Sequence, residues 1–376
     1  MTQERGNQKT LFGSDDHNKP RNKLKLNKKN IIEYLNSVLL IEEASGIRGK
    51  ISNLKMELLT LSEKFYNDVT EELRENEARI EWLLRDLDQI VDSYTAERMK
   101  YYINRLIKSL EEIRFGRVND INLNRWKEYD NILTDSLWLF DRRDSSGEHV
   151  GSYWGNFIPQ IPNQLLLRYS KSGEWVFDPF VGSGTTLIEC KRLGRNGIGI
   201  ELNDEVAQKA KERIKKEINK ENVITNIVVG DSGEVDYNSL LLQAGVKSVQ
   251  LVIMHPPYFN IIKFSDNGGD LSNTTSVDDF LNKLEIIVKK CRDILDKGRY
   301  FAIVIGDKYE GGHWIPLGFY SMQMILKSGF SLKSIVVKNF DETKGKRNQK
   351  ELWRYRALLG EYYVFKHEYI FIFIKE

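Results

Sequence analysis

The spacing of apolar residues along the chain changes near residue 150. Before that point apolar side chains recur at steps of three and four, as in Ile51, Leu54 and Leu58, and charged residues separate them. This spacing is typical of amphipathic helices. We therefore expect a helical arm or small bundle over residues 31–150, ending in a mixed connector. Recognition of DNA, dimerisation or bracing of the rest of the chain would each suit such a region.

From residue 151 onward short apolar runs alternate with helical patterns. The expected strands cover residues 175–177, 197–202, 227–229, 249–254, 300–306, 332–337 and 369–374. Alternation of this kind predicts an α/β domain over residues 151–376, with a mostly parallel, seven-stranded sheet covered by helices on both faces. Because the last two strands lie close together in sequence, one antiparallel strand is expected at the sheet edge.

Composition narrows the class of protein further. A hydrophobic content of 41% supports a real core, and no apolar run has the length of a membrane span, so no membrane partner is expected. Residues 1–30 are polar and lysine-rich, which predicts a disordered basic tail without a signal peptide. Only Cys190 and Cys291 are present, and no cluster has metal-ligand spacing. These features favour a cytoplasmic protein without disulfides or metal.

The first chemical motif, Asp178-Pro-Phe-Val-Gly-Ser-Gly-Thr-Thr, follows an apolar strand and precedes a helical pattern. Gly182 and Gly184 permit a tight turn, and the next helix offers free amide groups. Ligands of open α/β sheets bind at the carboxyl ends of the strands, where strand order reverses. No Gly-Lys-Ser/Thr follows, so a phosphate-binding P-loop is not indicated. The motif predicts a pocket for a nucleoside-containing cofactor.

Two acids that end the next strands extend this pocket. Glu201 stands where an acid commonly binds both hydroxyls of a ribose, although it could instead cap the following helix. Asp231, with Ser232, follows the third strand and could contact an adenine amino group; a helix cap is the alternative.

The second chemical motif is His255-Pro256-Pro257-Tyr258, at the end of another apolar strand. The prolines force an extended backbone and remove two amide donors, so acceptor carbonyls remain. A carbonyl and a side-chain acceptor can together receive both hydrogens of an exocyclic amine, and an aromatic ring can stack on the base that carries it. A base within a duplex would have to flip out to reach such a slot.

Together the two motifs resemble those of the DNA amino-methyltransferases, which use S-adenosyl-L-methionine to methylate adenine N6 or cytosine N4. The resemblance covers roughly residues 150–376; residues 157–162 resemble the segment that closes over the methionine part of the cofactor, and residues 367–373 resemble the last strand. It implies the class I methyltransferase (Rossmann-like) fold. The residues that it assigns to the cofactor are Phe157, Pro159, Asp178, Pro179, Phe180, Gly182, Gly184, Thr185, Glu201, Asp231 and Ser232.

The same resemblance assigns His255, Pro256, Pro257 and Tyr258 to the target base. The family usually has Asp, Asn or Ser where this chain has His255. A neutral imidazole accepts one hydrogen bond but a protonated one accepts none, so the position bears on both the target base and activity.

A basic stretch with interleaved aromatic rings, which begins at Lys338, has a composition suited to phosphate contacts and base stacking. The substrate-binding residues expected from it and from the loop after Tyr258 are Lys263, Lys346, Arg347, Trp353 and Arg354. The expected partners are double-stranded DNA with a flipped base, a cognate restriction endonuclease, and a second copy bound through the helical region. An RNA methyltransferase acting on guanine N2 and an inactive nucleic-acid-binding relative are the alternatives.

Overall fold

The computed structural model describes residues 28–65, 71–340 and 350–376, and the side chains of 61–79 and of Lys350 are outside the description. Nearly all of the predicted basic tail, residues 1–27, therefore lies outside the described residues. The chain divides into two compact units. One unit extends to Gly116 and includes Ile121–Asp130; the other comprises Arg117–Asp120 and Asn131–Glu376.

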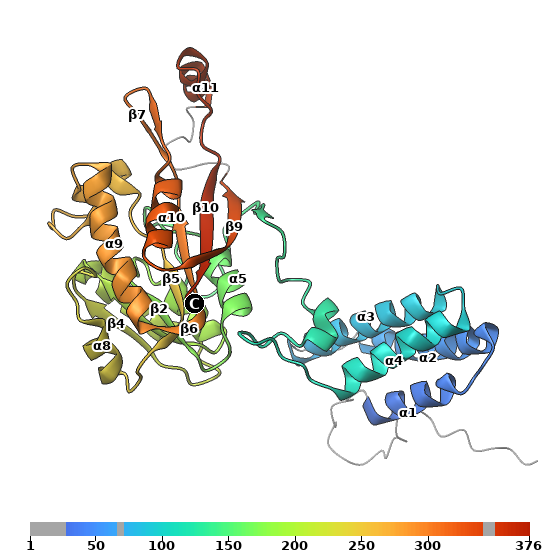
Figure 1. Cartoon of the computed structure of the whole chain (residues 1–376). Helices are drawn as coiled ribbons and strands as arrows, with labels where there is room; N and C mark the ends of the chain where they lie inside the picture. Colours follow the sequence, from blue (N-terminus) through green and yellow to red (C-terminus); the bar gives the residue numbers. More distant parts are fainter. Residues whose placement is uncertain (1–27, 66–70, 341–349) are drawn as a thin grey trace, which may run out of the picture. The chain divides into compact units, whose positions relative to one another are not determined.

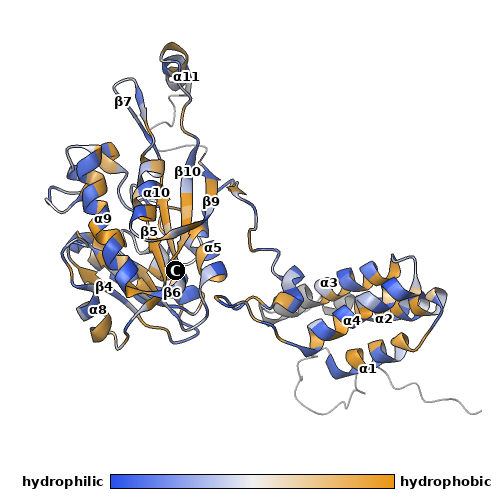
Figure 2. Cartoon of the chain, viewed as in Figure 1, coloured by the Kyte–Doolittle hydropathy of each residue, from blue (hydrophilic) through white to orange (hydrophobic). Residues whose placement is uncertain are grey.

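The first unit consists of helices, as the three- and four-residue spacing predicts. They are α1 (Lys28–Leu39), α2 (Ala44–Phe65), α3 (Glu71–Val91) and α4 (Ala96–Glu111), followed by a short 3-10 helix, Leu123–Glu128. Each helix presents an apolar stripe (Figure 2). Ile51, Leu54 and Leu58 on α2 are fully buried in one cluster with residues of the other three helices. Burial of this shared face holds the unit together, since isolated helices are marginal in water.

The second unit is built on one large sheet (Figure 1). Its strands are β1 (Leu137–Trp138), β2 (Trp175–Asp178), β3 (Asn196–Glu201), β4 (Thr225–Val229), β5 (Val249–Met254), β6 (Leu295–Ile305), β9 (Ser331–Asn339) and β10 (His367–Ile374). The order is β1-β9-β10-β6-β5-β2-β3-β4, and β10 alone among the named strands of this sheet runs antiparallel to its neighbours.

All seven predicted strands occur, but the prediction of a seven-stranded sheet was wrong by one. The eighth strand, β1, pairs with β9 through only two residues, of which Leu137 is exposed and Trp138 buried. Two residues are too few to show the alternation that marks a strand. The continuous segment of the second unit that carries β1 starts at Asn131, within the stretch that the sequence predicts as the connector of the helical region. The antiparallel strand also lies inside the sheet, between β6 and β9.

Helices cover both faces of this sheet. These helices are α5 (Gln160–Tyr169), α6 (Thr185–Arg192), α7 (Asp204–Lys216), α8 (Tyr237–Gln243), α9 (Val277–Ile294) and α10 (Leu317–Lys327). Helix α11 (Lys350–Leu359) stands away from the sheet (Figure 1). Alternate side chains of each strand enter opposite cores. Ile303 and Ile305 of β6 pack with α8, α9 and α10, whereas Ala302 and Val304 pack on the face of α5.

The strand order creates a switch point at β2. From β2 the chain continues to β3 and β4 on one side, and then crosses to β5 and β6 on the other. The carboxyl ends of β2 and β5 therefore meet where the sheet reverses direction, which is where open α/β sheets bind ligands. No helix among the described residues is long and apolar enough to cross a membrane. The described part of the chain also contains no group of three His, Cys, Asp or Glu side chains placed to hold a metal ion.

Candidate cofactor and base site

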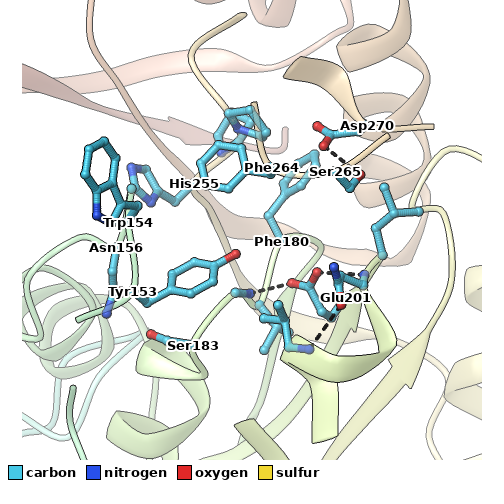
Figure 3. A pocket seen from close by; sticks show the side chains of 18 of the residues that line it. Tyr153, Trp154, Asn156, Phe180, Ser183, Glu201, His255, Phe264, Ser265 and Asp270 are labelled. Carbon is cyan, nitrogen blue, oxygen red and sulfur yellow. Dashed lines mark hydrogen bonds between the residues drawn. The ribbon is translucent and has the colours of Figure 1, made fainter. Parts of the chain in front are cut away.

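A cavity of 430 Å³ opens at the carboxyl ends of β2, β3 and β5. Of the residues predicted from the sequence, those that line it are Phe157, Pro179, Phe180, Gly182, Glu201, Ser232, His255, Pro256, Pro257 and Lys263. The others assigned to cofactor or base are not among its lining residues: Pro159, Asp178, Gly184, Thr185, Asp231 and Tyr258. The two motifs, about seventy residues apart in sequence, thus meet in one cavity (Figure 3).

The loop after β2 folds back over β3. The Val181 amide donates to the Ile200 carbonyl at 3.0 Å, and Gly182 adopts a φ of 53° that side chains rarely allow. The close approach also requires Gly199, because a Cβ there would lie 2.2 Å from Val181 Cγ2. Gly199 is a third glycine of this site, and sequence reasoning missed it because its need arises from the crossing of two segments.

Glu201 lies at the end of β3 and is 9% exposed. Its Oε2 accepts from the Gly182 amide at 2.8 Å and its Oε1 from the Asn203 amide at 2.9 Å. Burial raises the pKa of this carboxyl, while the two amide contacts act in the opposite direction. Two carboxylate oxygens have about four acceptor positions, so both retain capacity for ligand hydroxyls. Helix α7 is capped by Asn203 instead of by Glu201.

Asp178 lies beneath the glycine loop and is almost fully buried. Its Oδ1 accepts from the Phe180 amide at 2.8 Å, and its Oδ2 makes no hydrogen bond with the described residues. Burial raises the pKa of this carboxyl to about 7, while the nearby Thr186 hydroxyl and the Phe180 amide act in the opposite direction. An unpartnered buried acceptor of this kind is costly unless a ligand satisfies it.

Three further predicted residues are close in sequence to residues that line the cavity. Thr185 begins α6 and its hydroxyl donates to Asn156 Oδ1 at 2.8 Å, which ties the helix to the cavity segment 152–157. Gly184 precedes it with a φ of 90°. Pro159 stands at the start of α5. Their observed contacts orient the wall of the cavity.

The adenine end of the predicted site differs in detail from the expectation. Asp231 Oδ2 lies against Gly269, where a Cβ would come within 2.1 Å, and Asp231 does not line the cavity. Asp270 lines it instead, and accepts from the Ser265 hydroxyl at 2.9 Å. Ser232 also lines the cavity and donates to the Pro179 carbonyl at 2.5 Å. The irregular loop that carries Asp270 has no periodic pattern, so no sequence signal pointed to this residue.

Aromatic side chains form much of the remaining wall (Figure 3). Tyr153 stacks on Phe264 with ring centroids 6.4 Å apart, and burial raises the pKa of its hydroxyl well above the usual range. Phe157 packs against the His255 ring at 4.7 Å. Tyr153 and Phe264 were not predicted from the sequence. A wall of this kind suits planar rings.

His255 directly follows β5 and lines the cavity. Its Nε2 lies 3.0 Å from the Tyr258 hydroxyl, which donates to Glu368 Oε2 at 2.9 Å. Burial lowers the pKa of His255 to about 4, so the ring is neutral near pH 7. The Tyr258 ring packs beside Gly306, outside the cavity lining. In this structure its hydroxyl joins His255 to Glu368 through hydrogen bonds.

The basic stretch divides into parts with different surroundings. Lys338, the first residue of the stretch, is buried on β9 and pairs with Glu368 at 3.2 Å, so it is not part of an exposed basic surface. Lys346 and Arg347 lie outside the described residues. Arg354 is exposed on α11, and Trp353 beside it is half-buried. Lys263 is exposed at the cavity and pairs with Asp266.

Comparison with known proteins identifies the family. The model of a DNA methylase family, N6_N4_Mtase, matches residues 12–212 and 249–376. Type II methyltransferase M2.DpnII of Streptococcus pneumoniae is 36% identical over 29% of this chain and 43% of its own. Type II methyltransferase M.MjaII of Methanocaldococcus jannaschii is 32% identical over 28% of this chain and 21% of its own.

The matched segments span less than half the length of these two relatives. The family model, in contrast, covers most of this chain. The sheet, with its reversal at β2 and its antiparallel β10, is that of a class I methyltransferase. The chain therefore belongs to the N6_N4_Mtase family of DNA methylases.

Proposed function

We propose that this protein transfers a methyl group from S-adenosylmethionine to an exocyclic amine of DNA, adenine N6 or cytosine N4, on a flipped base. One observation carries the proposal: Glu201 and His255, from separate motifs, line the same cavity at the switch point of the sheet. A carboxylate for a ribose and an acceptor for an amine are the two recognition elements that the reaction needs.

The residues of the cavity fit the cofactor of this family. Glu201 would accept both ribose hydroxyls, since its carboxylate keeps acceptor capacity beyond its two amide donors. The unpartnered Oδ2 of Asp178 suits the ammonium of the methionine part, once the glycine loop shifts to admit it. Asp270 and Ser232 line the same cavity and would contact the adenine ring. S-adenosylmethionine supplies, when bound, an electrophilic methyl group.

The chain's own residues orient and activate the amine. His255 and the Pro256 carbonyl would each accept one amine hydrogen, which keeps electron density on nitrogen and aims its lone pair. Most of the acceleration would then come from orientation and fixed dipoles. Cys190 and Cys291 are both buried, which supports direct transfer without a cysteine nucleophile.

The wider surroundings of the cavity favour DNA as the partner. Lys263 lines it, and α11 carries the exposed Arg354 and Arg356. Segment 360–365 follows α11 and packs on the β7–β8 hairpin (Lys308–Glu310 and His313–Ile315), with Tyr309 and Tyr362 stacked at 4.1 Å. The hairpin follows the carboxyl end of β6, the cavity edge of the sheet.

The remaining proposals concern setting and assembly. We infer a duplex whose target base flips, with Lys346 and Arg347 as further phosphate contacts, and a restriction–modification setting with a cognate endonuclease. The helical unit is proposed to mediate dimerisation. Two free, buried cysteines support a reducing compartment such as the cytoplasm.

The test is transfer of tritiated methyl from S-adenosylmethionine to unmethylated duplex DNA, single-stranded DNA and tRNA, followed by nucleoside mass spectrometry. N6-methyladenine or N4-methylcytosine in DNA is the expected product, and it identifies the base. Label confined to tRNA would replace the proposal with RNA methylation. Absence of label with bound cofactor would indicate an inactive relative. Glu201→Ala, which we expect to bind the cofactor more weakly, serves as the control with reduced transfer.

A further inference from the structure

The two ring nitrogens of His255 have different surroundings. Nε2 lies 3.0 Å from the Tyr258 hydroxyl, whereas Nδ1 makes no hydrogen bond with any residue in the described part of the chain. The side chain is partly exposed and lines the cavity. Which nitrogen carries the proton therefore decides whether the ring offers a ligand an acceptor or a donor.

A buried ion pair behind Tyr258 determines the direction of this hydrogen bond. Lys338 and Glu368 are directly opposite in the register of β9 and β10, and their charged atoms lie 3.2 Å apart. Both side chains are largely buried, at 7% and 11% exposed. A carboxylate in an ion pair with an ammonium can only accept hydrogen bonds.

The positions of the protons on Tyr258 and His255 follow from this acceptor. Because Glu368 only accepts, the Tyr258 hydroxyl donates its one proton to Oε2 at 2.9 Å. The Tyr258 oxygen then accepts from His255, so the proton of the imidazole sits on Nε2. Nδ1 is left with a lone pair. Burial lowers the pKa of His255 to about 4, which keeps the second proton off near pH 7.

We propose that Lys338, Glu368 and Tyr258 act as positioning residues that lock His255 in its Nε2-protonated form, so that Nδ1 accepts a hydrogen from the target amine. The proposal deepens the proposed function and rests on it for the identity of the amine. It also explains how a histidine replaces the Asp, Asn or Ser usual in this family: a side-chain oxygen accepts by its nature, but an imidazole needs its tautomer fixed.

Sheet topology explains why these residues meet. His255 and Tyr258 follow the carboxyl end of β5, and Lys338 lies near the carboxyl end of β9. Glu368 is the second residue of β10, which runs antiparallel, so its start lies at the same edge. The three strands thus bring four side chains together at the cavity.

The first experiment measures the tautomer in the full chain without DNA, by long-range proton–nitrogen correlation spectra of labelled protein. The spectrum of His255→Asn identifies the His255 signals among those of the five histidines. We expect a protonated Nε2 and an unprotonated Nδ1. In Glu368→Gln, whose amide can donate to Tyr258, and in Tyr258→Phe, we expect the Nδ1-protonated form to appear. A protonated Nδ1 in the unaltered protein, or no change in either variant, would overturn the inference.

Turnover provides the second test. Glu368→Gln should lower kcat about tenfold to a hundredfold, with the KM for S-adenosylmethionine unchanged. In a His255→Asn background the same change should cost little, because a carboxamide oxygen needs no tautomer control. Equal losses in both backgrounds would show a structural role only. Glu285→Gln, which removes the surface pair with Lys289, is the matched control and should not alter kcat.

The proposed DNA methylation and the proposed tautomer of His255 can be refuted independently. The spectra need neither DNA nor methyl transfer, so they report on the tautomer even if the protein modifies another substrate. Methylated DNA together with a protonated Nδ1 would refute the inference and leave the function standing.

Discussion

The backbone amide of Gly182 donates a 2.8 Å hydrogen bond to the side chain of Glu201, joining the glycine loop after β2 to the acid at the end of β3. The bond fixes the Glu201 carboxylate at the cavity wall before any ligand binds. A side chain held in this way loses little conformational entropy on binding, which favours the ribose contact that we propose for it.

We expect Glu201→Ala to weaken S-adenosylmethionine binding about tenfold to a hundredfold, the range for loss of hydrogen bonds to a charged group. Titration calorimetry of the variant and the unaltered protein measures the change. Glu205→Ala, an exposed acid in the first turn of α7, is the control and should bind normally. Unchanged affinity in Glu201→Ala would remove the ribose assignment.

Asp178 gives the protein without cofactor a distinct pH dependence. Its pKa is raised to about 7 by burial, so the folded chain binds this proton more tightly than the unfolded chain. The stabilisation is complete below about pH 4 and is lost as the pH rises through about 7. At about 1.4 kcal/mol per pKa unit, the loss is on the order of a few kcal/mol.

Asp178→Asn should remove this contribution, since an amide does not titrate and can still accept from the Phe180 amide. Thermal unfolding between about pH 5 and 8 should therefore show a smaller decline in Tm for the variant than for the unaltered chain. Asp266→Asn is the control, because that exposed carboxyl has a lowered pKa. Parallel curves for Asp178→Asn and the unaltered protein would contradict the prediction.

Gly199 tests the close packing of the glycine loop. A Cβ at this position would lie 2.2 Å from Val181 Cγ2 and 2.8 Å from the Asp178 carbonyl, so Gly199→Ala must displace the loop. We expect a loss of about 1–3 kcal/mol in unfolding free energy, together with weaker cofactor binding. Denaturant unfolding and calorimetry measure the two effects.

Adding Val181→Ala to Gly199→Ala should restore part of the lost unfolding free energy, because it removes the nearer of the two contacts. Gly49→Ala in α2 is the comparison, since nothing lies within 4 Å of its added carbon and alanine favours the helix. If Gly199→Ala were as stable as Gly49→Ala, the loop would not depend on this approach.

Strong local patterns made the sheet and the cavity predictable, whereas contacts between segments that are distant in sequence leave no local pattern. The apolar runs locate seven strands. Asp178 and Glu201 end two of them and His255 directly follows a third, so the order of a parallel sheet places these residues at one edge. The pairing of Lys338 with Glu368 depends on the register of β9 with β10, which no local pattern encodes. For the same reason the sequence alone suggests that Lys338 belongs to a basic surface stretch.

Arg354 and Arg356 on α11 test the proposed DNA surface. Both are exposed, and each arginine that contacts phosphate releases counterions when the complex forms. The double variant Arg354→Ala, Arg356→Ala should bind duplex DNA more weakly, and the slope of log affinity against log salt should fall by about two. Fluorescence anisotropy over a series of salt concentrations gives both quantities.

The matched control removes two exposed lysines of α7, Lys209 and Lys215, and thus the same net charge. If the protein attracted DNA only through its overall charge, both double variants would lose the same amount of DNA affinity. If α11 contacts phosphates directly, the α11 double variant should lose more affinity and more of the salt slope than the α7 double variant. Short-range contacts determine the slope, because salt screens the more distant charges. Equal slopes in the two variants would therefore exclude α11 from the DNA interface, while the cavity assignment would be unaffected.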